Sequence, residues 1–152
     1  MIDYIFLIIL LSFLIPVSVI DIKSLRLPDI LTLPLMVIGF IQAHIIGDDV
    51  NGAILGAILG YSAFVIVELT FKYVRGVDGL GRGDAKLLAA GGAWCSWLWL
   101  PQIVLFGSIC AIITIIFMRK SNYLISKKMA IPFGPFLAVA ILLVWSAQTF
   151  YI

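Results

Sequence analysis

The stretch IDYIFLIILLSFLIPVSVI, residues 2–20, decides the fold class of this chain. It is a long apolar run in which Asp3 is the only charged side chain. A helix needs roughly 20 mostly apolar residues to cross the hydrocarbon core of a bilayer. No basic segment precedes the run and no small-residue cleavage site follows it, so we interpret it as a retained membrane span rather than a signal peptide.

Further apolar segments follow along the whole chain. The six segments run over about 2–20, 30–47, 53–71, 86–100, 102–118 and 134–151. We expect Pro101 to break the helix between the fourth and fifth segments, and Trp94, Trp97 and Trp99 to lie at a membrane interface. Charged residues make up 12% of the chain and hydrophobic residues 63%, whereas a soluble domain carries about 25% charged residues. The sequence therefore predicts one all-α, polytopic membrane domain over residues 1–152, with about six transmembrane helices.

The basic residues fall only in the loops after the first, third and fifth segments. They are Lys23 and Arg26, then Lys72, Arg75, Arg82 and Lys86, then Arg119, Lys120, Lys127 and Lys128. The second and fourth loops carry only the acids Asp48 and Asp49. Because basic loops stay in the cytoplasm, we expect both termini outside and the odd-numbered loops at the cytoplasmic face. No basic stripe suited to nucleic acid is present.

Two acids stand at this same membrane face. Asp21 ends the first segment in PVSVIDIKSLRLPDILTLP, residues 16–34, and Asp84 opens the fourth in GVDGLGRGDAKLLAAGGAW, residues 76–94. Two carboxylates held close together cannot both ionise cheaply, so they share a proton. The ionised member activates water and the protonated member polarises a carbonyl group. The pair therefore predicts aspartic peptide hydrolysis.

Each acid also has a structural interpretation when it is taken alone. Asp84 suits the N-cap of a helix that begins at Ala85. Asp21 suits an interfacial acid paired with Lys23 or Arg26, or the N-cap of a short amphipathic stretch. The glycines that precede Asp84 in the second motif allow the close approach of a substrate strand.

The other polar residues have structural interpretations as well. Asp29 is expected to cap the second segment, and Glu68 to be buried and paired with Lys72 one helical turn on. Asp78 is interpreted as a loop charge or as a group that supports the pair. His44 lies near the outer face, far from both aspartates, so nucleophilic catalysis based on histidine has no base.

Several residue patterns exclude metal and disulfide chemistry. Cys95 and Cys110 lie in apolar segments without CxxC spacing, so we interpret them as small buried hydrophobic residues. The H-E-x-x-H motif of metalloproteases does not occur.

The spacing of Gly52, Gly56 and Gly60 predicts close packing of the third helix against a neighbour.

Three motifs together resemble those of bacterial type IV prepilin peptidases. They are DIKSLRLPDILTLPL at residues 21–35, GVDGLGRGDAKLLAAGGAW at 76–94 and AIPFGPFLA at 130–138. The resemblance covers roughly residues 15–145 in the family's order. It implies a helical Gly-x-Gly-Asp aspartic membrane protease of the bacterial inner membrane. Such an enzyme cuts the short basic leader from type IV prepilin or type II secretion pseudopilin precursors at the cytoplasmic face.

The resemblance also implies roles for individual residues. Asp21 and Asp84 match the catalytic aspartates. The substrate-binding and loop positions are Gly81, Gly83, Lys86, Lys23, Pro28, Pro132 and Gly134. No metal or organic cofactor is implied, and the partners are the precursor and the lipid bilayer. The loop over 119–135 is expected to form one wall of the site, with its basic residues at lipid headgroups.

Two departures from the family's pattern matter. The chain has no CxxC pairs, so N-methyltransferase activity is not predicted. Arg82 stands where the family often has a small or neutral residue, and it either favours the ionised form of Asp84 or contacts lipid headgroups. Two other functions stay open at this point, a catalytically idle assembly factor and a small transporter that uses Asp21 and Asp84 as an ion site.

Overall fold

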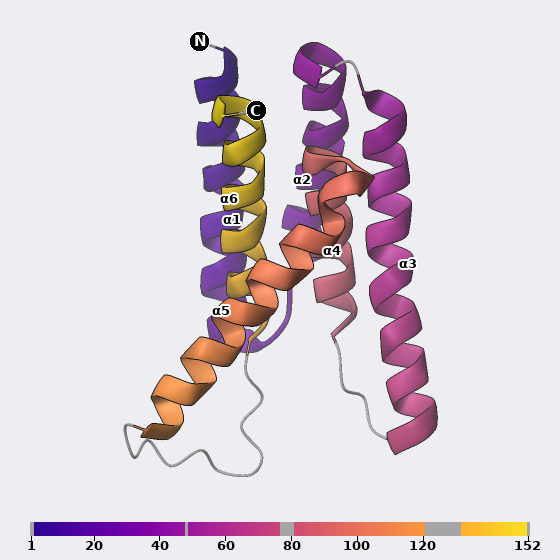
Figure 1. Cartoon of the computed structure of the whole chain (residues 1–152), viewed down its shortest axis with the longest axis vertical. Helices are drawn as coiled ribbons and strands as arrows, with labels where there is room; N and C mark the ends of the chain where they lie inside the picture. Colours follow the sequence, from indigo (N-terminus) through magenta and orange to yellow (C-terminus); the bar gives the residue numbers. More distant parts are fainter. Residues whose placement is uncertain (1, 48, 77–80, 121–131, 152) are drawn as a thin grey trace.

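The computed structural model describes residues 2–47, 49–76, 81–120 and 132–151. Every regular element in these ranges is a helix, which confirms the all-α class. The elements are α1 (Ile2–Ser24), α2 (Asp29–Gln42), the π-helix η1 (Ala43–Gly47), α3 (Val50–Arg75), α4 (Arg82–Cys95), the 3-10 helix η2 (Trp97–Trp99), α5 (Leu100–Lys120) and α6 (Gly134–Tyr151). Helices α1 and α6 lie side by side, and both termini are at one end of the bundle (Figure 1).

Four stretches of helix in the described ranges are long and apolar enough to cross a membrane. They are Ile2–Ser24, Asp29–Ile46, Val50–Val74 and Trp97–Met118, and the apolar helix Gly134–Phe150 is shorter. Large apolar side chains on the outer faces are exposed, as at Ile8 and Ile116. Such a surface is stable only against lipid. The expectation of a membrane protein with several spans is therefore confirmed.

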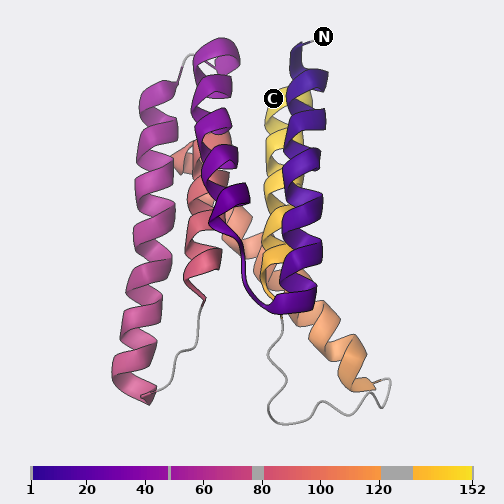
Figure 2. The ribbon, with the colours of Figure 1, turned by 180° about the vertical axis from the view of Figure 1, so that it is seen from behind.

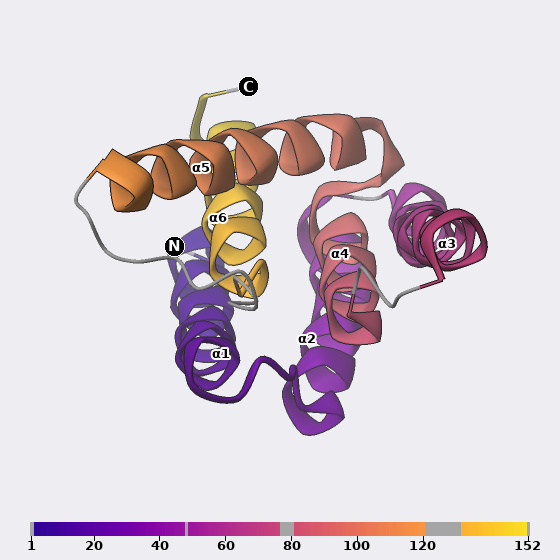
Figure 3. The ribbon, with the colours of Figure 1, turned by 90° about the horizontal axis from the view of Figure 1, so that it is seen from below.

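The fourth helix begins and ends earlier in the sequence than the predicted segment 86–100, and it lies inside the bundle. Helix α4 has 14 residues, and at 1.5 Å per residue it is about 21 Å long, less than the roughly 30 Å hydrocarbon core of a bilayer. Apart from Lys86, every residue from Asp84 to Cys95 is buried. The helix contacts α2, α3, α5 and α6, and Figure 3 shows it between α2 and α3 when the bundle is seen end on.

Small residues allow α4 to be enclosed in this way. A Cβ on Gly56 of α3 would lie 2.3 Å from the carbonyl oxygen of Gly92 in α4. A Cβ on Gly60 would lie 2.8 Å from the carbonyl oxygen of Leu88. The two backbones are thus in direct contact, which confirms the close packing predicted from the glycine spacing.

Trp94 is a core residue, so its expected place at a membrane interface is wrong. It is 4% exposed, and its indole Nε1–H donates to the carbonyl oxygen of Leu35 at 2.8 Å. The glycine at position 39 leaves room for the ring, because a Cβ there would lie 2.7 Å from Trp94 Cδ1. Burial is stable because the N–H group has a partner. Trp97, by contrast, is 44% exposed.

The break between α4 and α5 occurs before Pro101, not at it. Ser96 has a φ of 66°, and the 3-10 helix Trp97–Trp99 follows it. Pro101 lies in the first turn of α5, where its missing N–H group costs no helical hydrogen bond. A proline in this sequence position starts a helix as readily as it stops one, and here it starts one.

The helices end at different levels at the end of the bundle away from the termini. Helices α3 and α5 extend further in that direction than α1, α4 and α6 (Figure 1, and from behind in Figure 2). The last turn of α1 and the first turns of α4 and α6 are therefore recessed between two longer helices.

We expect Gly56→Ala to lower the free energy of unfolding by about 1–3 kcal/mol, the usual cost of overpacking. The added Cβ meets backbone, which cannot rotate away as a side chain can. Unfolding by SDS in mixed micelles, followed by tryptophan fluorescence, measures the change. Leu55→Ala, at a lipid-facing neighbouring position that is 48% exposed, is the control. Equal unfolding curves for the two variants would refute the close contact.

Candidate active site

Asp21 lies in the last turn of α1 and faces the inside of the bundle. It is 3% exposed, and its Oδ2 accepts a hydrogen bond from the N–H group of Gly134 at 2.9 Å. Gly134 is the first residue of α6, and the unpaired N–H groups at a helix N-terminus favour an anion. Lys23 and Arg26 are both exposed. Asp21 is thus an inward-facing group held by α6 rather than an interfacial acid.

The end of α1 directs the chain toward the start of α4. Leu25 has a φ of 52°, and its N–H donates to the carbonyl oxygen of Asp21 at 2.8 Å, which closes the helix. The chain then turns, and Leu27 packs against Gly83, where a Cβ would lie 2.8 Å from Leu27 Cβ. The two motifs that carry the acids are therefore in contact through a position that only glycine fills without a shift.

Asp84 is the third residue of α4, so the alternative in which it caps a helix beginning at Ala85 is wrong. The N-cap is Gly81, whose carbonyl oxygen accepts the N–H of Asp84 at 3.0 Å. The Asp84 side chain points inward, and the residue is 8% exposed. Its Oδ1 has no hydrogen-bond partner within the described part of the chain. This oxygen is buried, so a water molecule or a substrate group that binds it must enter the bundle.

The two carboxyl groups influence each other. Burial, and after it the charge of Asp21, raise the pKa of Asp84 to about 7. Asp84 lies outside the four stretches that are long enough to span a membrane. Near neutral pH Asp84 is therefore protonated in part of the molecules, so it can donate a hydrogen bond while the second acid accepts one. This is the arrangement that general acid–base catalysis by two carboxyl groups requires.

An ion pair joins the start of α2 to α4. Lys86 Nζ donates to Asp29 Oδ1, and both side chains are partly exposed. Asp29 was expected to cap α2, but it is the first residue of that helix, and the N-cap Pro28 makes no side-chain hydrogen bond. The expected cap is wrong because a partner 57 positions along the chain binds the carboxylate instead.

A second ion pair joins α3 to the start of α4. Glu68 is buried, as expected, and its Oε1 lies 3.5 Å from Arg82 Nε. Arg82 was expected to favour the ionised form of Asp84 or to contact lipid headgroups, whereas the pKa of Asp84 is raised by burial and by the charge of Asp21. Arg82 is directed to α3 instead.

Two aromatic residues near the acids were missed by the sequence analysis. The rings of Phe64 in α3 and Phe133, which precedes α6, are 6.3 Å apart between centroids and tilted by 40°. Phe133 is adjacent to Gly134, so this contact braces the segment that holds Asp21. The four-residue spacing of the glycines of α3 indicates Phe64, because Phe64 lies four residues after Gly60 and is on the face of α3 that packs on α4.

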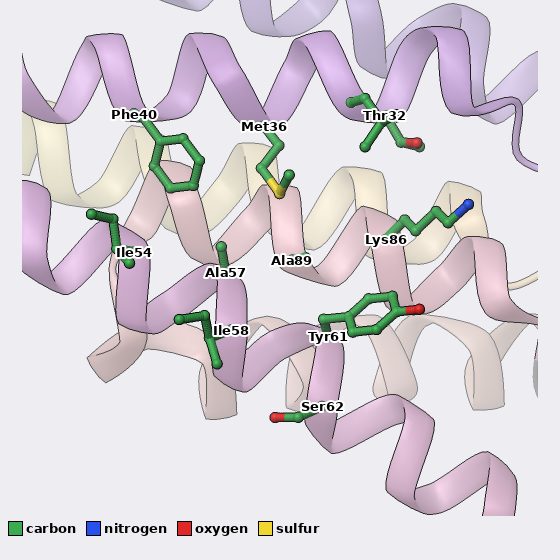
Figure 4. A pocket seen from close by; sticks show the side chains of 11 residues that line it. Thr32, Met36, Phe40, Ile54, Ala57, Ile58, Tyr61, Ser62, Lys86 and Ala89 are labelled. Carbon is green, nitrogen blue, oxygen red and sulfur yellow. The ribbon is translucent and has the colours of Figure 1, made fainter.

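An apolar groove of about 550 Å³ runs between α2 and α3, with α4 as its floor. Figure 4 shows Phe40 and Ile54 at one end of it, and Thr32 and Lys86 at the other. Lys86 is two residues from Asp84, so the groove ends beside the start of α4. No sequence pattern predicts this groove, because it depends on the separation of α2 and α3.

The predicted site residues are placed as follows. Gly134 lies on Asp21, Gly81 lies beside Asp84, Gly83 lies on Leu27, Pro28 precedes α2, Lys86 lines the groove, Lys23 is exposed in the last turn of α1, and Pro132 is half-buried before Phe133. Asp48, Asp78, Gly79, Lys127 and Lys128 lie outside the described residues.

No group of three or more His, Cys, Asp or Glu side chains able to hold a metal ion occurs among the residues that the structure describes. Cys95 and Cys110 are free thiols in different helices. His44 is exposed in η1, which follows the end of α2 opposite to Asp29.

Comparison with known proteins identifies relatives over most of the chain. The model of the type IV leader peptidase family (Peptidase_A24) matches residues 8–116. A prepilin leader peptidase/N-methyltransferase of Pectobacterium carotovorum subsp. carotovorum is 44% identical over 136 residues, which are 86% of this chain and 47% of the relative. One of the same name from Pseudomonas aeruginosa is 41% identical over 139 residues, 89% of this chain and 47% of the relative.

A shorter relative is covered more fully. The leader peptidase HopD of Escherichia coli is 39% identical over 124 residues, which are 79% of this chain and 78% of that protein. The chain spans about half the length of the two longer relatives. No solved structure matches it.

We expect the carboxyl C=O stretching band of Asp84 to disappear as the pH rises through about 7, in infrared difference spectra against Asp84→Asn. In Asp21→Asn the midpoint falls, because a charge that raises the pKa is gone. The raised pKa also makes the folded state less stable as pH rises from about 4 toward 7, since only the unfolded chain releases this proton there. Asp29→Asn is the control and should leave the band in place. A band that titrates near pH 4 would contradict the buried pair.

Proposed function

Since the chain belongs to the type IV leader peptidase family, we propose that it is an aspartic endopeptidase that removes the basic leader from type IV prepilin or pseudopilin precursors. The names of the relatives support the substrate class. The observation that carries the mechanism is the pair of buried acids, Asp21 and Asp84, in electrostatic reach of each other. The proposal covers the peptidase activity alone, and no methyltransferase activity is proposed.

The geometry supports different tasks for the two acids. Asp21, at the N-terminus of α6, is the carboxylate that takes a proton from water as the water oxygen attacks the scissile carbonyl carbon. Asp84, in its protonated form, donates a hydrogen bond to the carbonyl oxygen through the unpartnered side of its carboxyl group. When the C–N bond breaks, the proton taken from water passes to the leaving amine. The two acids then hold the same number of protons as before.

The site also fits a substrate that is anchored in the membrane. The acids lie at the recessed end of the bundle away from the termini (Figure 1). The basic loops follow α1, α3 and α5, so this end faces the cytoplasm of a bacterial inner membrane and both termini lie outside. The precursor and the surrounding lipid are the proposed partners.

We expect Asp21→Asn and Asp84→Asn each to reduce cleavage of a prepilin-like precursor by at least about a hundredfold, the lower range of general acid–base contributions. Cleavage is measured in membranes by the size shift of the precursor, with the amount of inserted enzyme determined in parallel. Asp29→Asn removes an exposed carboxylate from the same end and should cleave normally.

Cleavage at the wild-type rate by either Asn variant would exclude the two-acid mechanism. No cleavage by the wild type, together with a cation flux that depends on both acids, would favour a transporter. No cleavage and no flux would favour an assembly factor.

We expect Gly134→Ala to lower kcat by about 10- to 100-fold with little change in KM, because a shift of about 1 Å in a catalytic group has effects of this size. The new Cβ would lie 2.6 Å from Asp21 Oδ2 and would push the carboxylate aside. Gly107→Ala is the matched control, since its Cβ would have no neighbour closer than 3.4 Å. Equal kcat values for the two variants would show that Gly134 does not position Asp21.

A further inference from the structure

One ion pair next to the acids has no step in the proposed hydrolysis. Arg82 Nε lies 3.5 Å from Glu68 Oε1, and Arg82 precedes Asp84 by two residues. We propose that Glu68 is a specificity-determining residue, which binds a basic side chain of the peptide to be cut, and that Arg82 occupies this position until the peptide arrives. The inference rests on the proposed peptidase function and names the group that its site recognises.

The two members of the pair are buried to very different extents. The side chain of Glu68 is 10% exposed and that of Arg82 is 72% exposed. A buried carboxylate needs a cation or hydrogen bonds to offset its lost hydration, whereas the exposed guanidinium keeps most of its water. Arg82 therefore loses little when it moves into solvent, but Glu68 still requires a positive partner.

The contact between them is also a loose one. It is made by a single guanidinium nitrogen at 3.5 Å, whereas strong arginine–carboxylate pairs place two nitrogens against two oxygens at about 2.8 Å. A lysine or arginine that reaches Glu68 from a bound peptide can make the shorter contact and displace Arg82.

The periodicity of α4 places Arg82 in line with the apolar groove. Residues spaced by four and three positions share a helix face, so Arg82, Lys86 and Ala89 lie along one side of α4. Lys86 and Ala89 line the groove, and Lys86 is at its end in Figure 4. Arg82 is therefore one turn beyond the end of the groove.

The periodicity of α3 gives the same result for Glu68. Ile54, Ile58 and Tyr61 line the groove from α3. Glu68 lies seven positions after Tyr61, which returns it to the same side of the helix two turns further on. Glu68 therefore lies on the same side of α3 as the apolar side chains that line the groove.

These positions define the chemistry of the peptide that fits. An apolar helical segment of the precursor lies along the groove, in contact with side chains of α2 and α3, and a basic side chain just outside the membrane reaches Glu68. The groove extends from Thr32 to Phe40, nine residues of α2, and these two residues are about 12 Å apart along the helix. The chain between the apolar segment and the basic residue, which contains the cleavage site, is then next to the start of α4, where Asp84 lies.

The test compares two precursors that are identical except that the basic residues before the cleavage site are Gln in one of them. We expect wild-type kcat/KM to be about tenfold higher for the basic precursor, and Glu68→Gln to reduce this ratio to about one. We expect Arg82→Ala to lower KM for the basic precursor, because the internal competitor is gone. A purely structural ion pair would instead make both variants slower toward both precursors.

The same question is answered without cleavage by binding. A fluorescent basic peptide is titrated into the full chain in detergent, and we expect weaker binding to Glu68→Gln and tighter binding to Arg82→Ala than to the wild type. Asp49→Asn, which removes an equal charge at the opposite end of the bundle and keeps a residue that suits the N-cap of α3, is the control and should bind as the wild type does. An unchanged affinity in Glu68→Gln, or weaker binding by Arg82→Ala, would overturn the inference.

The binding titration does not depend on cleavage. It therefore distinguishes a failure of the proposed peptidase function from a failure of the proposed role of Glu68. If the wild type cuts neither precursor, the peptidase function fails and the binding titration still decides the role of Glu68. If the wild type cuts both and Glu68→Gln keeps the same preference, the peptidase function stands and the role of Glu68 is excluded.

Discussion

The direct contact between the backbones of α3 and α4 is the constraint on which the rest of the structure depends. No Cβ fits between Gly56 and the carbonyl group of Gly92, so α4 lies deep in the bundle, where four helices enclose it. Its first turn is buried as a consequence. Burial is the larger of the two causes that raise the pKa of Asp84, so the packing of glycines in the membrane sets the protonation of an acid at its edge.

The candidate site is assembled from segments that are distant in the sequence. Asp21 comes from the end of α1, its hydrogen-bond donor Gly134 from the start of α6, and Asp84 from the start of α4. Each of these is a helix terminus, where backbone N–H or C=O groups are free to bind other groups. Rigid helices fix the position of each terminus. The side chains of the site are therefore held in place by the packing of the helices that carry them.

Much of this arrangement could be predicted from the sequence, and the remainder depended on contacts that a sequence does not display. Apolar runs and the segregation of basic residues gave the all-α class and placed Asp21 and Asp84 at one end. The fourth segment was expected to end near residue 100, but its helix ends at Cys95. Trp94 looked like an interfacial residue, whereas the room left by Gly39 makes it part of the core. The ion pair between Glu68 and Arg82 was also beyond reach, since Arg82 lies on another helix.

The central claim is that the two carboxyl groups act as one unit, and binding of a peptide analogue tests it most directly. In the analogue, a hydroxyl-bearing carbon replaces the scissile amide and presents its oxygen to both acids. We expect Asp21→Asn and Asp84→Asn to weaken binding, measured by calorimetry on the full chain, and the double variant to lose no more than the weaker-binding single variant, because coupled residues are not additive. The claim would be contradicted if the loss of affinity in the double variant were the product of the losses in the two single variants. It would also be contradicted if neither single change altered the affinity.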